Sequence, residues 1–279
     1  MTTFILVISS VFFACTCLSL IVIFLISPSG RIKKTREFFD GDVLYAHRGL
    51  HGGDIPENSL PAFEAACVSG YGIELDIHLT RDEKLVVFHD DTLARMCGAD
   101  VRTEELTLDE LMAYRLGESG EHIPSFDEVL ALVDGRAPLI IELKGNSRKN
   151  MRLCELAAKR LDSYGGKYCI EAFNPFFVRW FKKNRPEVVR GQLSCKMRKT
   201  DNGGSGMGGA VDLILENMLL SVFARPDFVA YDINSRHRFA FKLVRALGAF
   251  PVAWTVRSES DMKAAEESFC AAIFENIMP

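Results

Sequence analysis

Three carboxylates follow or interrupt apolar runs at positions where they could bind a metal ion. Glu74 and Asp76 alternate with apolar residues in GIELDIHL, and Glu142 stands near the end of PLIIEL. Side chains alternate along a strand, so Glu74 and Asp76 share one face if this run is a strand. A salt bridge to Arg48 or Lys144 would satisfy a single buried carboxylate. Three converging oxygen ligands instead favour a hard cation such as Mg²⁺ or Ca²⁺.

Two histidines stand at the ends of apolar runs and could transfer protons. His47 follows VLYA and His89 follows LVVF. One such histidine is more often an ordinary surface residue, but two of them near the carboxylates favour a general acid and a general base. Arg48 beside His47 offers a planar guanidinium, which suits a phosphate group. Four other histidines serve as controls without an expected catalytic role: His51, His78, His122 and His237.

These side chains need a scaffold that brings the ends of several strands together. Short apolar runs alternate with helical stretches from residue 43 onward. The runs are VLYAH (43–47), GIELDIHL (72–79), PLIIEL (138–143), YCIEAF (168–173), VVRGQL (188–193), DFVAYDI (227–233), FPVAWTV (250–256) and AAIFENI (271–277). This alternation favours a parallel sheet, and eight such units at this length favour a closed (β/α)8 TIM barrel.

One further apolar run breaks the alternation. LVVFHD (85–90) follows the second run after only Thr80 to Lys84, which is too short for a parallel crossover. We therefore predict an antiparallel hairpin within an insertion after the second barrel strand, over about residues 80–137. A later glycine-rich run, GGSGMGG (203–209), predicts a flexible loop, with a basic flap over the barrel mouth or against anionic lipid as the alternative.

The N-terminus carries a long apolar run without charge. A helix from Phe4 to Ile26 would reach about 34 Å, which is enough to cross a bilayer. A cleaved signal peptide would have a basic start and a shorter apolar run, so we favour an uncleaved transmembrane anchor over 1–27. A basic juxtamembrane linker follows over 28–42. By the positive-inside rule, its basic residues place the domain at 43–279 in the cytoplasm.

The composition limits the class of partner. The chain has 279 residues, of which 48% are hydrophobic, so it can bury a full core. Its formal net charge of -4 gives no overall reason to expect nucleic acid, which binds strongly basic surfaces. We expect a small-molecule substrate and a membrane as partners, and no nucleic acid.

In order and spacing, the motifs resemble those of the glycerophosphodiester phosphodiesterases. The motifs are His47-Arg48-Gly49, Pro56-Glu57-Asn58-Ser59, Glu74-Leu75-Asp76, Leu79-Thr80-Arg81-Asp82, Val86-Val87-Phe88-His89-Asp90 and Ile141-Glu142-Leu143-Lys144. The match is dense from about residue 43 to residue 145 and thinner afterwards. The resemblance implies a TIM barrel with a small insertion after the second strand. It also implies metal-dependent hydrolysis of glycerophosphodiesters to glycerol 3-phosphate and an alcohol.

The resemblance also implies a role for each site residue. The ligands of the divalent metal would be Glu74, Asp76 and Glu142. The general base and general acid would be His47 and His89. The phosphate would face Arg48 and Lys144. Glu57 would support the histidine and the arginine, with contact to the metal as the alternative.

The C-terminal part departs from the usual pattern of this family. Members often carry an Asn after Trp-Thr-Val and close with an Asp-Gly-Ile-Ile-Thr-Asp-Pro-like strand, whereas here Arg257 follows Val256. The choice of substrate therefore stays open. A lysophospholipid, as for a lysophospholipase D, is the first alternative, because the anchor would hold the barrel beside lipid. A barrel that binds phosphodiesters without catalysis is the second.

The linker itself predicts one more helix. RIKKTREFFD (31–40) places Ile32, Thr35, Phe38 and Phe39 at helical spacing. AAIFENI is not followed by a helix that could cover its outer face. We therefore predict that the linker helix packs over the outside of the last and first strands. A second protomer or the bilayer surface is the alternative cover.

Overall fold

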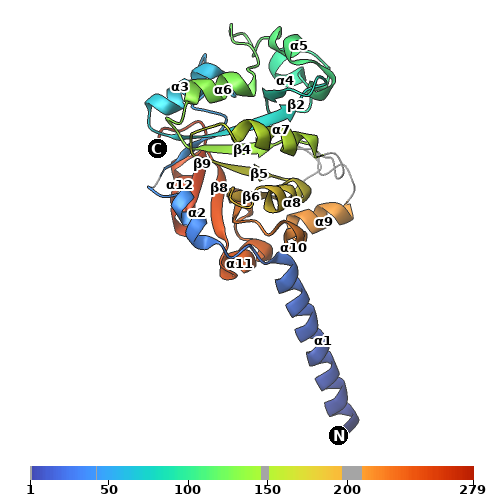
Figure 1. The fold of residues 1–279 in the computed structure, drawn as a ribbon. Coiled ribbons are helices and arrows are strands. Elements are labelled where there is room, and N and C mark those ends of the chain that lie inside the picture. Colours follow the sequence, from blue (N-terminus) through green and yellow to red (C-terminus); the bar gives the residue numbers. More distant parts are fainter. Residues whose placement is uncertain (1, 42, 146–150, 197–208) are drawn as a thin grey trace.

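Eight parallel strands form a closed barrel in the computed structural model, which describes residues 2–41, 43–145, 151–196 and 209–279 (Figure 1). The strands are β1 (Tyr45–Ala46), β2 (Gly72–Leu79), β4 (Leu139–Leu143), β5 (Tyr168–Ala172), β6 (Arg190–Ser194), β7 (Phe228–Asp232), β8 (Phe250–Val256) and β9 (Ala271–Phe274). β1 pairs with both β2 and β9, which closes the barrel. Each strand coincides with or overlaps a predicted run, so the (β/α)8 fold is confirmed. The glycine-rich run lies outside the described residues, apart from Gly209.

Helices cover the outside of the barrel. They are α3 (Leu60–Val68), α6 (Phe126–Val133), α7 (Arg152–Leu161), α8 (Pro175–Asn184), α9 (Gly209–Glu216), α10 (Ser221–Ala224), α11 (Phe239–Ala246) and α12 (Glu259–Ser268). Local sequence explains where several of them begin. Ser59 caps α3, where its Oγ accepts a hydrogen bond from the backbone N–H of Ala62 at 3.3 Å. The strands and the helices around them share one large core, to which Ile141 of β4 and Phe177 of α8 belong.

The insertion after β2 is shorter than predicted. β3 (Leu85–Val87) pairs antiparallel with β2, as the short connection required. α4 (Ala94–Cys97), the 3₁₀ helix η1 (Thr103–Glu105) and α5 (Leu108–Met112) follow and share a small core of their own. α6 does not belong to this unit, because its apolar face is buried in the main core beside α3. The insertion therefore ends before α6 and not at residue 137.

The predicted linker helix forms, but it occupies a different place. α2 (Ile32–Phe38) leads to Phe39, whose ring stacks on Phe250 with a centroid distance of 4.9 Å. The same ring meets Tyr45 and Phe228 edge-on. These three partners are the first residues of β1, β7 and β8, and their side chains point into the barrel. The end of α2 therefore closes the N-terminal end of the barrel interior.

The outside of the last strand has other covers. α12 packs against β8 and β9, and the ring of Tyr71 contacts Phe274 of β9 at 4.8 Å. The prediction that the linker helix covers this face was therefore wrong. The helix that precedes β9 already covers it, so the two phenylalanines of the linker are free to fill the barrel end.

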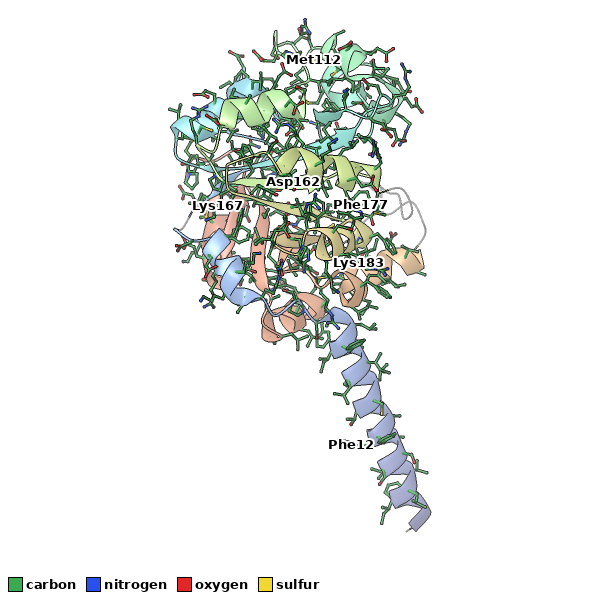
Figure 2. The ribbon with its side chains drawn as sticks, in the orientation of Figure 1. Phe12, Met112, Asp162, Lys167, Phe177 and Lys183 are labelled. Carbon is green, nitrogen blue, oxygen red and sulfur yellow. The ribbon has the colours of Figure 1, made fainter. Side chains whose placement is uncertain are left out.

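The N-terminal run forms α1 (Thr2–Ile26), which extends away from the barrel (Figure 1). Among the described residues it is the one helix long and apolar enough to span a membrane. Phe12 and other side chains of this helix project clear of the domain (Figure 2). Only its last turn reaches the barrel, where Ile26 is buried in the main core.

Candidate active site

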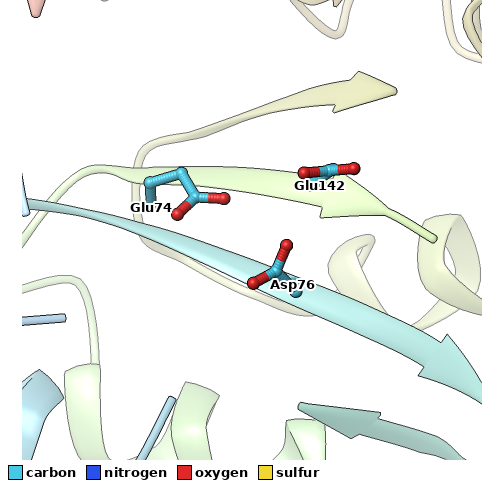
Figure 3. A group of neighbouring side chains, drawn as sticks. All are labelled: Glu74, Asp76 and Glu142. Carbon is cyan, nitrogen blue, oxygen red and sulfur yellow. The ribbon is translucent and has the colours of Figure 1, made fainter. Parts of the chain in front are cut away.

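The three carboxylates meet inside the barrel, as their spacing predicted. Glu74 and Asp76 point inward from β2, and Glu142 points inward from the adjacent β4, where it is in register with Asp76 (Figure 3). All three are buried, and their ligand oxygens lie within 4.8 Å of one another. Lys144 follows Glu142 at the C-terminal end of β4. The site thus opens at the C-terminal face of the strands, where TIM barrels place their active sites.

The carboxylates do not share one electrostatic environment. Burial and repulsion from Asp76 raise the pKa of Glu74 well above its ordinary value. Burial also raises the pKa of Glu142. Burial alone would raise the pKa of Asp76 too, but Lys144 and the nearby His89 lower it well below its ordinary value. Without an added cation, the protein therefore stabilises charge on Asp76 and disfavours charge on the two glutamates.

The salt bridges that were the alternative to a metal site also form. Lys144 Nζ lies 3.0 Å from Asp76 Oδ1 and 2.9 Å from Glu142 Oε2. Arg48 Nε lies 3.5 Å from Asp76 Oδ2, and its backbone N–H donates a hydrogen bond to Glu74 Oε2 at 3.0 Å. These contacts satisfy part of the negative charge and hold the carboxylates in place.

A fourth carboxylate, Glu171, was missed in the sequence. It points inward from β5 in register with Glu142, is 1% exposed, and its Oε2 has no hydrogen-bond partner. Burial and the charge of Glu142 raise its pKa well above the ordinary value. Its position near the end of YCIEAF repeats that of Glu142 in PLIIEL, and this signal could have revealed it.

This group of side chains fits a divalent cation. Four carboxylates, counting Glu171, face the two cations Lys144 and Arg48, so ionising all four leaves an excess of two negative charges. The donors are oxygens, which hard cations prefer. The pKa of Glu74 and of Glu142 is raised, so the protein alone does not fully stabilise their charged forms, and a bound cation would do so.

His47 lies where it can accept a proton. His47 directly follows β1. Its Nδ1 lies 3.1 Å from Glu275 Oε2, and its Nε2 lies 3.9 Å from Glu74 Oε2. Burial lowers the pKa of His47 to about 4, although the hydrogen bond with Glu275 opposes this shift. The ring is therefore neutral at pH 7. Since the carboxylate of Glu275 can only accept, Nδ1 carries the proton and Nε2 presents its lone pair toward the carboxylates.

Glu275 is the second residue that the sequence reasoning missed. It lies just after β9 and also accepts a hydrogen bond from Arg257 Nη2 at 2.7 Å. Burial would raise its pKa, but the hydrogen bond and charge of His47 and the charge of Arg257 lower it to about 2. The arginine that departs from the family pattern thus holds the carboxylate that orients His47.

Neighbouring residues of the insertion after β2 orient the ring of His89. Its Nδ1 lies 2.7 Å from Asp90 Oδ1, and Asp90 in turn accepts a hydrogen bond from Arg95 Nε at 2.7 Å. The backbone carbonyl of His89 accepts a hydrogen bond from His78 Nε2 at 3.2 Å. His78, one of the control histidines, therefore supports the backbone of His89 and does not line the cavity described below.

Arg48 is positioned by backbone geometry and by Glu57. Arg48 adopts a left-handed conformation with φ 54°, and its Nη1 donates a hydrogen bond to Glu57 Oε1 at 2.8 Å. Gly49 follows with φ 82°, and a Cβ there would meet Ala62 at 2.8 Å, so the turn requires glycine. Glu57 also binds Arg95. Glu57 therefore lies between two arginines and outside the group of three carboxylates.

A large cavity, lined by described residues, joins most of the site. It has a volume of about 1250 Å³, and both His47 and His89 line it together with the carboxylates Glu74 and Glu142. The remaining lining is mixed, with polar residues such as Asp232, Asn234 and Arg257. Its apolar part, here called the apolar wall, consists mainly of Phe173, Pro175, Phe176, Leu193, Ile214, Leu215, Leu220 and Trp254. The cavity can therefore contact both a charged group and an apolar group.

A TIM barrel that gathers carboxylates, imidazoles and cations at its C-terminal face has the features of a phosphate-ester site. Residues 47–277 match the glycerophosphoryl diester phosphodiesterase family, and the chain belongs to this family.

Individual relatives carry related names. A glycerophosphodiester phosphodiesterase of Caldanaerobacter subterraneus is 34% identical over 161 residues, which cover 54% of this chain and 66% of that protein. A human lysophospholipase D is 41% identical over 83 residues, or 29% of this chain and 26% of that protein. The chain spans between 45% and 66% of the length of the first bacterial relatives.

The fold is also found among solved structures. An Oleispira antarctica phosphodiesterase in complex with sn-glycerol-3-phosphate superposes with a TM-score of 0.67 at 23% identity. The superposition covers 83% of this chain and 92% of the other chain.

Proposed function

We propose that the protein hydrolyses a glycerophosphodiester to glycerol 3-phosphate and an alcohol. One observation carries this proposal: the ligand oxygens of Glu74, Asp76 and Glu142 converge within 4.8 Å in a cavity that two oriented histidines also line. Membership in the glycerophosphoryl diester phosphodiesterase family supports it.

The three carboxylates would hold Mg²⁺ or Ca²⁺. When bound, this cation would act as a Lewis acid on a phosphoryl oxygen and neutralise developing charge. Arg48 and Lys144 line the same cavity and would bind the remaining phosphate oxygens.

The two histidines would divide the proton transfers. Nε2 of His47 would accept the proton of the nucleophile, which is water or the neighbouring glycerol hydroxyl. Attack by the hydroxyl would give a cyclic phosphate first, which water would then open to glycerol 3-phosphate. Glu275 would then stabilise the imidazolium through Nδ1, as the carboxylate of a catalytic triad does. His89 would donate a proton to the departing alkoxide, with its ring held in place by Asp90.

The reaction would take place beside a membrane. α1 would cross the bilayer once, and the basic residues after it would keep the barrel on the cytoplasmic side.

A lysophospholipid is the second candidate substrate, and the apolar wall of the cavity favours it. Phe173 and Trp254 form an edge-on pair in this wall, at a centroid distance of 5.6 Å. An acyl chain could lie along these rings with the phosphodiester at the carboxylates. The similarity to the human lysophospholipase D is consistent with this alternative.

A comparison of substrates tests the two candidates. Purified protein would be incubated with glycerophosphocholine, glycerophosphoethanolamine and lysophosphatidylcholine, and the phosphorus-containing products identified by NMR. Glycerol 3-phosphate from the first two supports the diesterase, and lysophosphatidic acid from the third supports the alternative. Binding of all three without turnover would support the non-catalytic barrel instead.

A further inference from the structure

The end of α1 is built into the barrel. Ile26 is 1% exposed and belongs to the main core. Arg225, which follows α10, donates a hydrogen bond from Nη1 to the carbonyl of Ser27 at 2.9 Å. The guanidinium of Arg225 also lies 5.0 Å from the centre of the Phe24 ring. The last turn of the apolar helix is therefore packed against α10, as Figure 1 shows.

A buried carboxylate fixes the residues that follow α1. Asp227 accepts hydrogen bonds from Ser29 Oγ at 2.5 Å and from Arg31 Nε at 2.8 Å. Its other oxygen accepts from the backbone N–H of Arg190 at 3.1 Å. Because Asp227 is only 3% exposed, breaking these contacts would leave a buried charge without partners. The apolar helix therefore leaves the domain at a fixed place.

An exposed aromatic ring lies near this exit. Outside α1, six large apolar side chains are exposed among the described residues: Val68, Leu213, Ile214, Phe223, Phe239 and Met278. Phe223 lies on α10, which packs against the end of α1. An exposed aromatic ring next to an apolar helix can contact the same apolar phase as that helix.

Two cationic side chains lie beside Phe223. Phe223 of α10 is 47% exposed, and the guanidinium of Arg179 lies 5.7 Å from the centre of its ring. Lys182 donates a hydrogen bond to the carbonyl of Phe223 at 3.3 Å. Aromatic rings beside Arg and Lys are typical of the interface between a membrane and water, where the cations meet anionic headgroups.

We propose that the docking face made by Phe223 with Arg179, Lys182 and Arg225 lies in the headgroup region of the bilayer that α1 crosses. The proposal rests on the proposed membrane anchor. Its occupant is an anionic lipid surface, because the face is continuous with the apolar helix and carries positive charge. The barrel is then held in one orientation on the membrane.

Quenching of tryptophan fluorescence by brominated lipid tests the docking. The full chain would carry Phe223→Trp, or Val68→Trp as the matched control, and would be reconstituted in vesicles of phosphatidylcholine and phosphatidylglycerol. Val68 is also exposed, but it lies on α3, on the other side of the barrel from α1 (Figure 1). The unmodified protein gives the signal of Trp180 and Trp254. Bromine on the acyl chains near the headgroups should quench Trp at position 223 beyond that signal, and should not quench Trp at position 68. Vesicles without phosphatidylglycerol should give less quenching.

Two controls separate the docking from the proposals on which it rests. Protein that sodium carbonate washes off the vesicles would overturn the anchor and the docking together. Protein that is retained but shows equal quenching at positions 223 and 68 would overturn the docking alone. A blue shift at position 223 without quenching by bromine would assign the face to a second protein copy. Turnover of glycerophosphocholine is measured in the same vesicles, so a failure of the proposed hydrolysis is detected separately.

Discussion

His47 and His89 face one cavity from different electrostatic environments. Burial lowers the pKa of His47 to about 4, so its ring is neutral at pH 7 and can accept a proton. His89 has Asp90 on its Nδ1, and Arg95 fixes that carboxylate. Glu275, which Arg257 fixes, holds Nδ1 of His47 in the same way. The two rings therefore differ chiefly in burial, since the side chain of His47 is 11% exposed and that of His89 is 24% exposed. Groups whose surroundings differ can act as base and acid in one reaction, and we propose His47 as the base and His89 as the acid.

Loss of either ring should slow turnover without unfolding the protein. We expect His47→Ala and His89→Ala each to lower kcat by about 10²-fold, the usual effect of losing a general acid or base. His122→Ala is the matched control, because His122 pairs with Glu128 outside the cavity and its loss should leave kcat near the wild-type value. Equal losses in all three variants would show that the histidines are assigned wrongly.

The metal ligands should be separable from the rest of the site by a binding measurement. Glu74→Ala, Asp76→Ala and Glu142→Ala should each abolish activity and the calorimetric signal of Mg²⁺ or Ca²⁺ binding, because each removes one of three charged ligands. Glu57→Gln should retain cation binding, since Glu57 lies between two arginines. A carboxylate variant with full turnover in metal-free buffer would refute the metal site.

Glu275 should control the protonation of His47. Its hydrogen bond and charge raise the pKa of His47 against the effect of burial, so Glu275→Gln should move that pKa below about 4. The imidazolium that forms during proton transfer would also lose its counter-ion, and kcat should fall by about 10-fold or more. NMR titration of labelled histidine measures the pKa directly. An unchanged or higher pKa in the variant would contradict this role.

At the scale of the elements, the two ends of the barrel differ. The C-terminal ends of the β-strands carry the polar site, and aromatic packing closes the N-terminal end. Phe39 enters from α2 and meets rings from three strands. Aromatic rings bury large areas and prefer the stacked and edge-on contacts seen here. The linker that follows α1 is therefore part of the folded domain as well as a connection to α1.

Removal of the Phe39 ring should destabilise the whole barrel. Phe39 is buried, so Phe39→Ala should lower the free energy of unfolding by about 3–5 kcal/mol, the usual cost of truncating a buried phenylalanine. Urea unfolding of the full chain in detergent, followed by circular dichroism, gives this value. Val68→Ala on the exposed surface is the control and should change it little. An unchanged stability for Phe39→Ala would place α2 outside the core.

The sequence was sufficient for features that depend on local periodicity. Alternation along GIELDIHL placed Glu74 and Asp76 on one face, and the short connection to LVVFHD required an antiparallel hairpin. The contact between His47 and Glu275 could not be predicted in this way, because it joins residues that are 228 positions apart. The place of Phe39 was missed for the same reason. Its spacing shows an apolar helix face but does not say which part of the barrel receives it.

At the scale of the whole molecule, α1, the linker and the barrel form one connected structure. Asp227 ties the linker to β7, and Arg225 ties the end of α1 to α10. A catalytic domain joined to its apolar helix in this way would sample few orientations on a membrane. The proposed docking face would then lie in the headgroup region, where a lysophospholipid or a glycerophosphodiester derived from lipid becomes available.

The central claim is that a cation held by Glu74, Asp76 and Glu142 is required to hydrolyse a phosphodiester in this cavity. The most direct test is the release of glycerol 3-phosphate from glycerophosphocholine by the purified full chain. The reaction would be followed after treatment with EDTA and again after Mg²⁺ or Ca²⁺ is restored. The account predicts no release in EDTA and recovery with one of the two cations, in the wild-type protein and not in Glu142→Ala. Release that continues unchanged in EDTA, or that Glu142→Ala retains in full, would contradict it.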